Sequence, residues 1–133
     1  MSGLTLDTGA LIALERKQHS MVQVYTTAQR AGVRITVPAV VVAEWWRAGA
    51  GKRFRERLMA SVVAEDLTRR LAELAGEALG SVVGSRPDKG TIDGIVVTSG
   101  WLRGDTIYTS DVPDLEAIRS SVRAFENVAI KRA

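Results

Sequence analysis

Apolar and polar positions alternate along the chain in blocks that predict short strands separated by longer helices. Apolar runs such as "LTL", "VRITV" and "TIYTS" have the length and the β-branched content of buried strands. The segment "ASVVAE" could continue the helix before it, but its paired valines favour a short strand. We therefore predict strands at residues 4–6, 33–37, 60–65, 106–110 and 127–130.

Helices are predicted between the strands by segments that begin at capping residues and end at helix breakers. Ser20 is a candidate N-cap with Gly32 as the stop of the same helix, and Asp66 and Thr91 are candidate caps of two later helices. The predicted helices cover residues 8–16, 20–31, 39–48, a basic segment that begins at about residue 52, and residues 66–79, 91–102 and 113–122. The segment "GSRPDKG" is predicted to be a loop.

The alternation of strands and helices predicts an α/β fold. Helical connections between strands form right-handed crossovers, so we expect a parallel sheet with helices on both faces. A length of 133 residues with 46% hydrophobic residues suits one domain, which we expect to span residues 1–133.

Composition excludes several kinds of functional site. The chain has no cysteine and one histidine, His19, so disulfides, thiolate metal sites and histidine-rich zinc centres are excluded. Any metal would have to be held by oxygen, and His19, in the polar stretch "ERKQHS", is expected in a surface loop. No apolar run approaches the roughly 20 residues that span a bilayer, so we expect a cytoplasmic protein.

Basic residues are concentrated in one part of the chain. The net charge is +3, and "GKRFRERL" holds four basic side chains within eight residues. Lysine and arginine neutralise nucleic-acid phosphates, so this segment is a candidate for binding a polyanion. A solvated helix face explains the same pattern equally well.

Four acidic residues occur where a carboxylate is energetically unfavourable. Asp7 and Asp111 follow predicted strands, whereas Glu44 and Asp93 lie in otherwise apolar helical segments. Because the carboxyl ends of parallel strands meet at one edge of a sheet, Asp7 and Asp111 are expected on the same rim. Four carboxylates resist ionising together without cations, and Mg²⁺ or Mn²⁺ prefer such oxygen ligands. The four acids therefore predict a common metal site.

Three of these acids also have a purely structural explanation. Asp7 and Asp111 precede helices and could act as N-caps, and Asp93 could complement the dipole of its helix. Glu44 lies in mid-helix, beside two tryptophans, and has no such explanation.

Four segments together resemble a known family. "LDTGALIAL", "VVAEWWR", "TIDGIVVTSG" and "YTSDVPDLEAI" resemble, in order and approximate separation, the acidic motifs of PIN domains, most closely those of VapC-type toxins of toxin–antitoxin pairs. The resemblance implies a three-layer α/β/α fold around a central, mostly parallel sheet of about five short strands. It also implies the site residues, with metal-binding and catalytic acids at Asp7, Glu44, Asp93 and Asp111, supporting hydroxyls at Thr8 and Thr109, and a further acid at Asp114.

The resemblance further implies an activity and partners. VapC-type toxins are Mg²⁺- or Mn²⁺-dependent endoribonucleases that hydrolyse RNA phosphodiester bonds, are usually homodimeric, and are inhibited by a small antitoxin. Basic side chains would then contact the RNA or the antitoxin, and the candidates are Arg47, Lys52, Arg53 and Arg55.

Two other functions remain open. The chain could be a PIN-like module that binds RNA or protein without cutting. It could also be a phosphotransfer enzyme with an aspartate at a strand end, although a haloacid-dehalogenase-like phosphatase needs a second aspartate where this chain has Gly9, and a receiver domain needs an adjacent acid pair that is missing.

Overall fold

A five-stranded parallel sheet forms the centre of the computed structural model, which describes residues 2–47 and 51–133. In the described residues the strands are β1 (Leu4–Leu6), β2 (Ile35–Pro38), β3 (Val63–Glu65), β4 (Thr106–Thr109) and β5 (Ala129–Arg132). Their order across the sheet is β3-β2-β1-β4-β5, and every neighbouring pair is parallel. The predicted central parallel sheet is confirmed.

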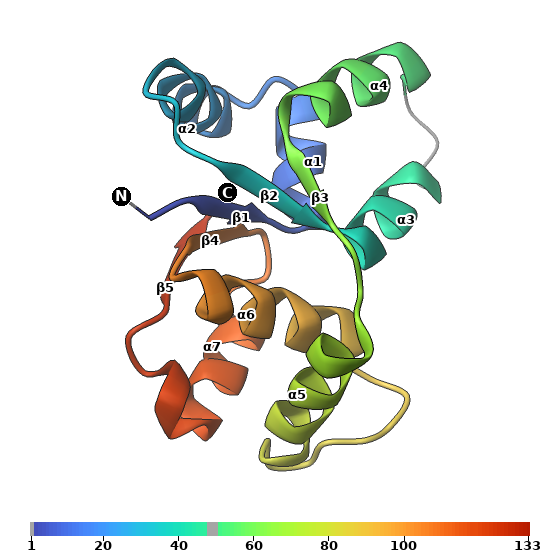
Figure 1. Cartoon of the computed structure of the whole chain (residues 1–133), viewed down its shortest axis with the longest axis vertical. Helices are drawn as coiled ribbons and strands as arrows, with labels where there is room; N and C mark the ends of the chain where they lie inside the picture. The colour runs from blue at the N-terminus through green and yellow to red at the C-terminus, as the bar shows by residue number, and fades with distance from the viewer. Residues whose placement is uncertain (1, 48–50) are drawn as a thin grey trace.

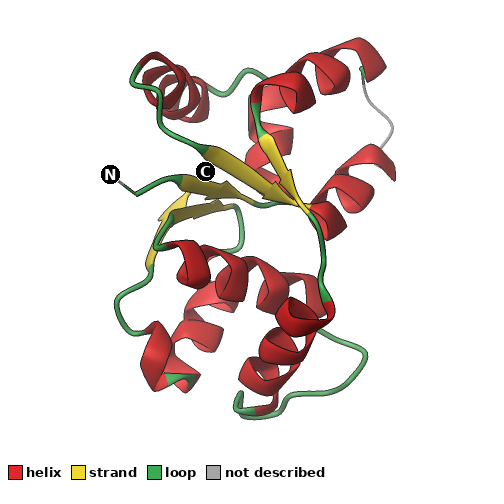
Figure 2. Ribbon diagram, viewed as in Figure 1, coloured by secondary structure: helices red, strands yellow, loops and turns green. Residues whose placement is uncertain are grey.

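Helices cover both faces of this sheet (Figure 1). One face carries α1 (Thr8–Glu15), α2 (His19–Arg30), α3 (Ala39–Arg47) and α4 (Lys52–Ser61), and the other carries α5 (Arg69–Gly80), α6 (Thr91–Arg103) and α7 (Val112–Ser121). A short 3-10 helix, Arg123–Phe125, precedes β5. Figure 2 shows the strands as one layer between two layers of helices, which confirms the predicted α/β/α architecture. No helix among the described residues is both long and apolar enough to cross a membrane.

The core consists of apolar side chains from the strands and from the helix faces that pack on them. Leu6 and Ile107 lie fully buried on the two central strands, and Trp45 and Val96 reach the core from α3 and α6. Burial of such side chains is the main driving force for folding, at about 1.5 to 3 kcal/mol for each large aliphatic group. The short central strands are therefore held chiefly by the helices on either side.

Three helix starts differ from the prediction. α5 is capped by Thr68 rather than Asp66, because the Thr68 hydroxyl accepts a hydrogen bond of 3.1 Å from the backbone N–H of Leu71. Thr91 is the first residue of α6, and Gly90, with φ 82°, holds the cap position. α2 begins at His19, so Ser20 is not its cap and His19 is exposed in a helical turn rather than in a loop.

One predicted boundary falls outside the described residues. The helix predicted to end at Ala48 is described only as far as Arg47. The 3-10 helix Arg123–Phe125 was not predicted, since its three residues "RAF" carry no periodic pattern.

Candidate functional site

The carboxyl edge of the sheet has a cavity where the strand order changes direction. β2 and β3 lie on one side of β1, whereas β4 and β5 lie on its other side. The connections that follow β1 and β4 therefore lead in opposite directions and leave a crevice at the carboxyl ends of these two strands. The cavity has a volume of about 400 Å³. Its lining comes from four segments of the chain and includes all four acids predicted from the sequence: Asp7, Thr8, Gly9, Glu44, Asp88, Gly90, Thr91, Ile92, Asp93 and Asp111.

Asp7 lies at the centre of this edge and is 6% exposed. Its backbone N–H donates to the carbonyl of Tyr108 on β4 at 3.2 Å, and its Oδ1 accepts from the N–H of Ala10 at 2.9 Å. Burial raises the pKa of the Asp7 carboxyl above its usual value, a hydrogen bond with Thr109 opposes this, and the charges of Asp111 and Glu44 add to it. Asp7 therefore caps α1 and also faces the acidic cavity.

Asp93 lies in the first turn of α6 and is half-buried. Desolvation raises the pKa of its carboxyl from 3.8 to about 6, and the charges of Asp114, Asp111, Asp7 and Glu44 add to the shift in that order. Within residues 2–47 and 51–133, no lysine or arginine forms an ion pair with any of these five acids. Their mutual repulsion is therefore not offset by any ion pair in this part of the chain.

Glu44 and Asp111 reach the cavity from exposed positions. Glu44 was predicted to lie in an apolar environment, and this is wrong, because its side chain is exposed on α3 while that of Trp45 is buried in the core. The hydroxyl of Thr8 donates to the Glu44 carboxylate and so holds it over the cavity. Asp111 occupies the N-cap position of α7 but makes no capping hydrogen bond through its side chain.

The predicted supporting residues lie beside the acids. Thr109 is fully buried, and its hydroxyl accepts from the N–H of Asp111 at 2.9 Å. Asp114 is in the first turn of α7 and lines a smaller cavity next to the main one, which Asp93 also lines. Asp114 therefore adds negative charge beside Asp93 without lining the main cavity.

The donor set suits a hard divalent cation. All candidate ligands are carboxylate or hydroxyl oxygens, which Mg²⁺ and Mn²⁺ prefer. Among the described residues, no three acid or histidine side chains already have the close spacing of a metal site. Carboxylates that repel one another lie apart around a cavity and can converge by side-chain rotation when a cation neutralises them. The types of ligand atom therefore suit such an ion, although the side chains are spaced widely around the cavity.

Solved structures provide an independent comparison for this fold. A chain in the crystal structure of VapBC2 from Rickettsia felis bound to a DNA fragment from their promoter is 12% identical, with a TM-score of 0.71 and 98% of each chain covered. A chain of DNA-bound VapBC from Salmonella typhimurium is 15% identical, with a TM-score of 0.72, covering 99% of this chain and 98% of that one. A toxin–antitoxin complex from Klebsiella pneumoniae matches at 19% identity and a TM-score of 0.63, covering 85% of this chain and 89% of that one.

The predicted PIN-like fold is therefore confirmed. No protein-family model and no curated protein sequence matches the chain, so the likeness is one of structure. In this PIN-like fold the four acids lie at the switch point between β1 and β4.

Asp88, Gly90 and Ile92 line the cavity but were not identified from the sequence, and neither was a close contact at Gly9. Gly9 faces Ser110 across the β1–β4 edge, and a Cβ built on Gly9 would lie 1.9 Å from the Ser110 Oγ and 2.5 Å from its Cβ. Only glycine allows this approach. A single sequence gives no signal for it, because the contact joins the first turn of α1 to the bend after β4, about a hundred residues away.

We expect Gly9→Ala to destabilise the protein by about 1 to 3 kcal/mol, since overpacking would displace Ser110, the residue between Thr109 and Asp111. Gly76→Ala is the control, because no atom lies within 4 Å of a Cβ at Gly76. Urea unfolding measures both, and the double variant Gly9→Ala/Ser110→Gly should recover part of the loss. Equal midpoints for Gly9→Ala and the parent would contradict the close contact.

The raised pKa values of Asp7 and Asp93 predict how the metal-free protein responds to pH. Between the unfolded value of 3.8 and the folded value of about 6 for Asp93, the folded state binds more protons than the unfolded state. Stability should therefore fall as pH rises through this window. Urea midpoints in EDTA at pH 5 and pH 7 measure the effect, which should be smaller in Asp93→Asn. An identical pH response in the two proteins would count against the shift at Asp93.

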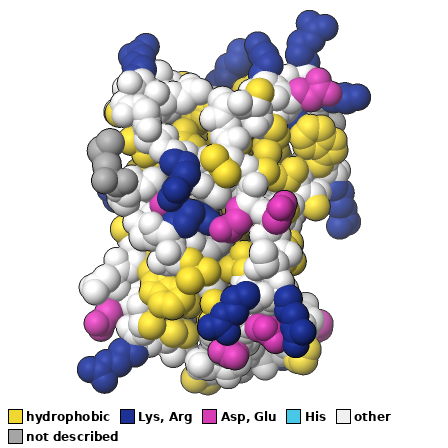
Figure 3. Space-filling model, viewed as in Figure 1, with side chains coloured by type: hydrophobic (Ala, Val, Ile, Leu, Met, Phe, Trp, Pro, Cys, Tyr) yellow, Lys and Arg dark blue, Asp and Glu magenta, His cyan; other side chains and the backbone are white. Residues whose placement is uncertain are grey.

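Basic side chains project from the end of the molecule that carries α2 and α4 (Figure 3). Lys52 and Arg53 are exposed in the first turn of α4, and Arg47 is exposed at the end of α3. Arg55 was predicted to contact RNA or an antitoxin, and the structure corrects this. It is 3% exposed, lies 3.5 Å from the Glu15 carboxylate, and donates to the carbonyl of Trp46 at 2.6 Å.

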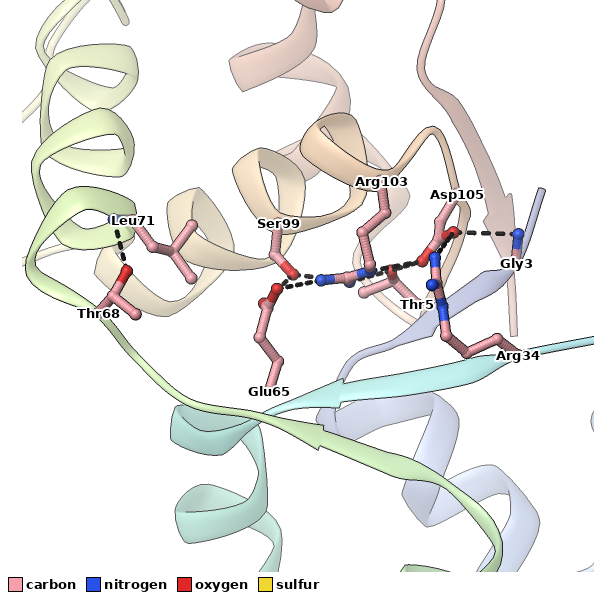
Figure 4. A network of polar contacts seen from close by, with 9 residues as sticks. All are labelled: Gly3, Thr5, Arg34, Glu65, Thr68, Leu71, Ser99, Arg103 and Asp105. Carbon is pink, nitrogen blue, oxygen red and sulfur yellow. Dashed lines mark hydrogen bonds and ion pairs between the residues drawn. The ribbon is translucent and has the colours of Figure 1, made fainter.

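Other acids belong to a structural network that extends from the amino ends of β1 and β4 to Glu65 at the end of β3 (Figure 4). Arg103 donates to Asp105 at 2.9 Å, to Thr5 at 2.8 Å and also to Glu65. Asp105 also accepts from the N–H of Gly3 at 3.0 Å. Here a guanidinium neutralises the carboxylates and ties α6 to β1 and β3. Asp7, Glu44, Asp93 and Asp111, by contrast, form no ion pair within the described residues.

Proposed function

We propose that this chain is the toxin of a VapBC-type toxin–antitoxin pair and that it cleaves RNA as a Mg²⁺- or Mn²⁺-dependent endoribonuclease. The observation that carries the proposal is the convergence of Asp7, Glu44, Asp93 and Asp111 on one cavity, where none of these four carboxylates pairs with a lysine or arginine of the described residues. Structural likeness to chains of VapBC complexes supports the choice of family.

Each acid has a distinct role in this proposal. Asp7 is the rigid ligand, because the N–H of Ala10 and the Thr109 hydroxyl fix its carboxylate. Thr8 orients Glu44, while Asp93 and Asp111 complete the ring from α6 and the β4 edge. A bound divalent ion would supply positive charge to the phosphodiester and acidify water for its hydrolysis.

RNA phosphates need cations outside the acidic ring. Arg47, Lys52 and Arg53 are exposed and remain candidates for this contact or for contact with an antitoxin. We exclude Arg55 from the surface that meets either partner, since it is buried against Glu15 and two tryptophans.

Incubation of the purified chain with bulk RNA tests the proposal. Cleavage is expected with Mg²⁺ or Mn²⁺, and none with EDTA. A preparation of Asp93→Asn made in parallel controls for contaminating nucleases. RNA binding without cleavage in either metal would favour the non-cleaving alternative. Hydrolysis of a small phosphate monoester, with RNA left intact, would favour the phosphotransfer alternative.

We also propose that the chain forms a homodimer. Val63 on the edge strand β3 and Trp46 on α3 are 49% and 39% exposed, and such apolar side chains are unfavourable in water. The dimer should appear as twice the chain mass in light scattering at micromolar concentration. Val63→Lys should weaken it by about tenfold, as expected for an apolar interface contact. Leu102→Lys, an exposed leucine on α6, is the matched control, and a monomeric parent would reject the dimer.

A further inference from the structure

A second groove adjoins the acidic cavity. It has a volume of about 490 Å³ and lies between α5 and the segment at residues 85–91 that leads into α6. Thr91 lines both this groove and the acidic cavity. A smaller cavity of about 220 Å³ also touches both spaces, because Gly90 and Asp93 line it together with Leu79 and Arg86. The three spaces therefore adjoin one another along one side of the molecule.

The groove is mostly apolar inside and basic at its rim. Its wall on α5 includes small residues at Ala72, Ala75, Gly76 and Gly80. Arg86 and Lys89, from the segment between α5 and α6, line its other side. In Figure 1 this segment extends along the same side of the molecule as the carboxyl ends of the strands.

We propose that this groove binds a base of the RNA nucleotide next to the cleaved bond, with Arg86 and Lys89 contacting the adjoining phosphates. The inference rests on the proposed ribonuclease function and assigns it a substrate subsite. The groove is within the size range of small-molecule pockets. Small side chains leave a smooth apolar wall on which the face of any base can pack, so binding here should be tolerant of sequence.

Charge supports RNA as the occupant. The acidic cavity repels phosphates, so a strand that enters it needs cations on the approach. Among the described residues Arg86 pairs only with Asp88, at 3.5 Å. Both side chains are mostly exposed, so this pair is weak. No carboxylate in the described part of the chain lies within ion-pair distance of Lys89. Both cations are therefore available to phosphates.

Gly76 allows the groove to be filled without disturbing the fold. It lies within α5, and no atom is within 4 Å of a Cβ built there. Gly76→Leu should therefore occupy the groove and lower kcat/KM for RNA about tenfold, mainly through KM, as expected for loss of one base contact. The melting temperature should stay the same or rise, because glycine is unfavourable within a helix. Gln23→Leu, which adds apolar bulk at an exposed position of α2, is the control.

The rim is tested separately by Arg86→Ala/Lys89→Ala. Loss of two phosphate contacts should reduce the salt dependence of RNA binding by about two in the log–log slope. Arg30→Ala/Arg123→Ala removes two exposed cations elsewhere and should leave kcat/KM unchanged. Unchanged kcat/KM and binding in both Gly76→Leu and Arg86→Ala/Lys89→Ala would overturn the subsite even if the parent cleaves RNA normally.

Binding in EDTA separates the subsite from the proposed catalysis. The probe is a fluorescein-labelled single-stranded RNA of mixed sequence that contains 4-thiouridine. Crosslinks to residues 72–95 that Gly76→Leu suppresses would support the subsite whether or not the parent cleaves with metal. Crosslinks confined to α2 and α4 would overturn it. A change from dimer to monomer in Gly76→Leu would also overturn it, because the groove would then be a subunit contact.

Discussion

Asp93→Asn is expected to abolish most RNA cleavage while making the metal-free protein more stable. Loss of one carboxylate ligand should lower the rate by about 100-fold or more, since a catalytic metal supplies several kcal/mol of transition-state stabilisation. Desolvation of the half-buried Asp93 carboxylate, and after it repulsion from four neighbouring acids, raises its pKa to about 6. Its removal should stabilise the metal-free fold at pH 7 by about 1 to 2 kcal/mol, after allowance for its partial exposure.

Two measurements on the same preparations decide this prediction. The cleavage rate is taken in excess Mg²⁺ or Mn²⁺, and the thermal midpoint is taken in EDTA. Asp66→Asn is the matched control, because Asp66 is exposed and lies outside the acidic cavity. If Asp93 only complements the dipole of α6, its loss would instead lower stability by about 0.3 to 1 kcal/mol and leave the rate unchanged. The two explanations therefore differ in the sign of the stability change.

The fold could be predicted because local patterns and topology agree. Short runs of β-branched and aromatic residues such as "TIYTS" favour β-strands. Helical connections between successive strands lead to parallel pairing. Helix starts were less predictable. Asp66 and Thr68 are both capping residue types, and the choice between them depends on where the chain leaves β3. The direction of the chain after β3 depends on tertiary packing, so local sequence does not determine which residue is the cap.

The site could be predicted where topology alone places the residue. Asp7 and Asp111 follow β1 and β4, and neighbouring parallel strands bring their ends together. Glu44 was selected on the assumption that it lies among buried residues, whereas the structure exposes it and brings it to the cavity through the Thr8 hydroxyl. The residue was placed in the cavity, but the physical reason given for it was wrong.

Charge was the least reliable guide to position. Arg55 shares one face of α4 with Leu58, three residues later, and both are buried. The three-residue spacing of Arg55 and Leu58 is visible in "GKRFRERL". Arg55 was nevertheless predicted to be a surface contact, because the residues around it are mostly basic. The groove beside α5 had no sequence signal, because it depends on how the segment at 85–91 packs against α5.

The buried position of Arg55 predicts a large effect of its substitution on stability. Its guanidinium lies 3.5 Å from Glu15 and 5.4 and 5.9 Å from the ring centroids of Trp45 and Trp46. Arg55→Ala would leave the Glu15 carboxylate and the Trp46 carbonyl without their partner. Breaking one side of a buried ion pair destabilises by about 3 to 5 kcal/mol, so a marginally stable domain should lose much of its stability.

A companion variant shows whether the pair itself is responsible. Two nitrogens of Arg55 and one oxygen of Glu15 are buried without a hydrogen bond, so the pair is incompletely satisfied. Arg55→Met/Glu15→Gln removes both charges and keeps an acceptor for the Trp45 indole N–H, which donates to Glu15 at 3.2 Å. It should recover at least about 1 kcal/mol relative to Arg55→Ala. Arg53→Ala, an exposed arginine on the same helix, should change stability by less than about 0.5 kcal/mol. Urea midpoints from tryptophan fluorescence compare the three variants. Equal midpoints for Arg55→Ala and Arg53→Ala would contradict the buried position of Arg55 and make it a candidate RNA contact again.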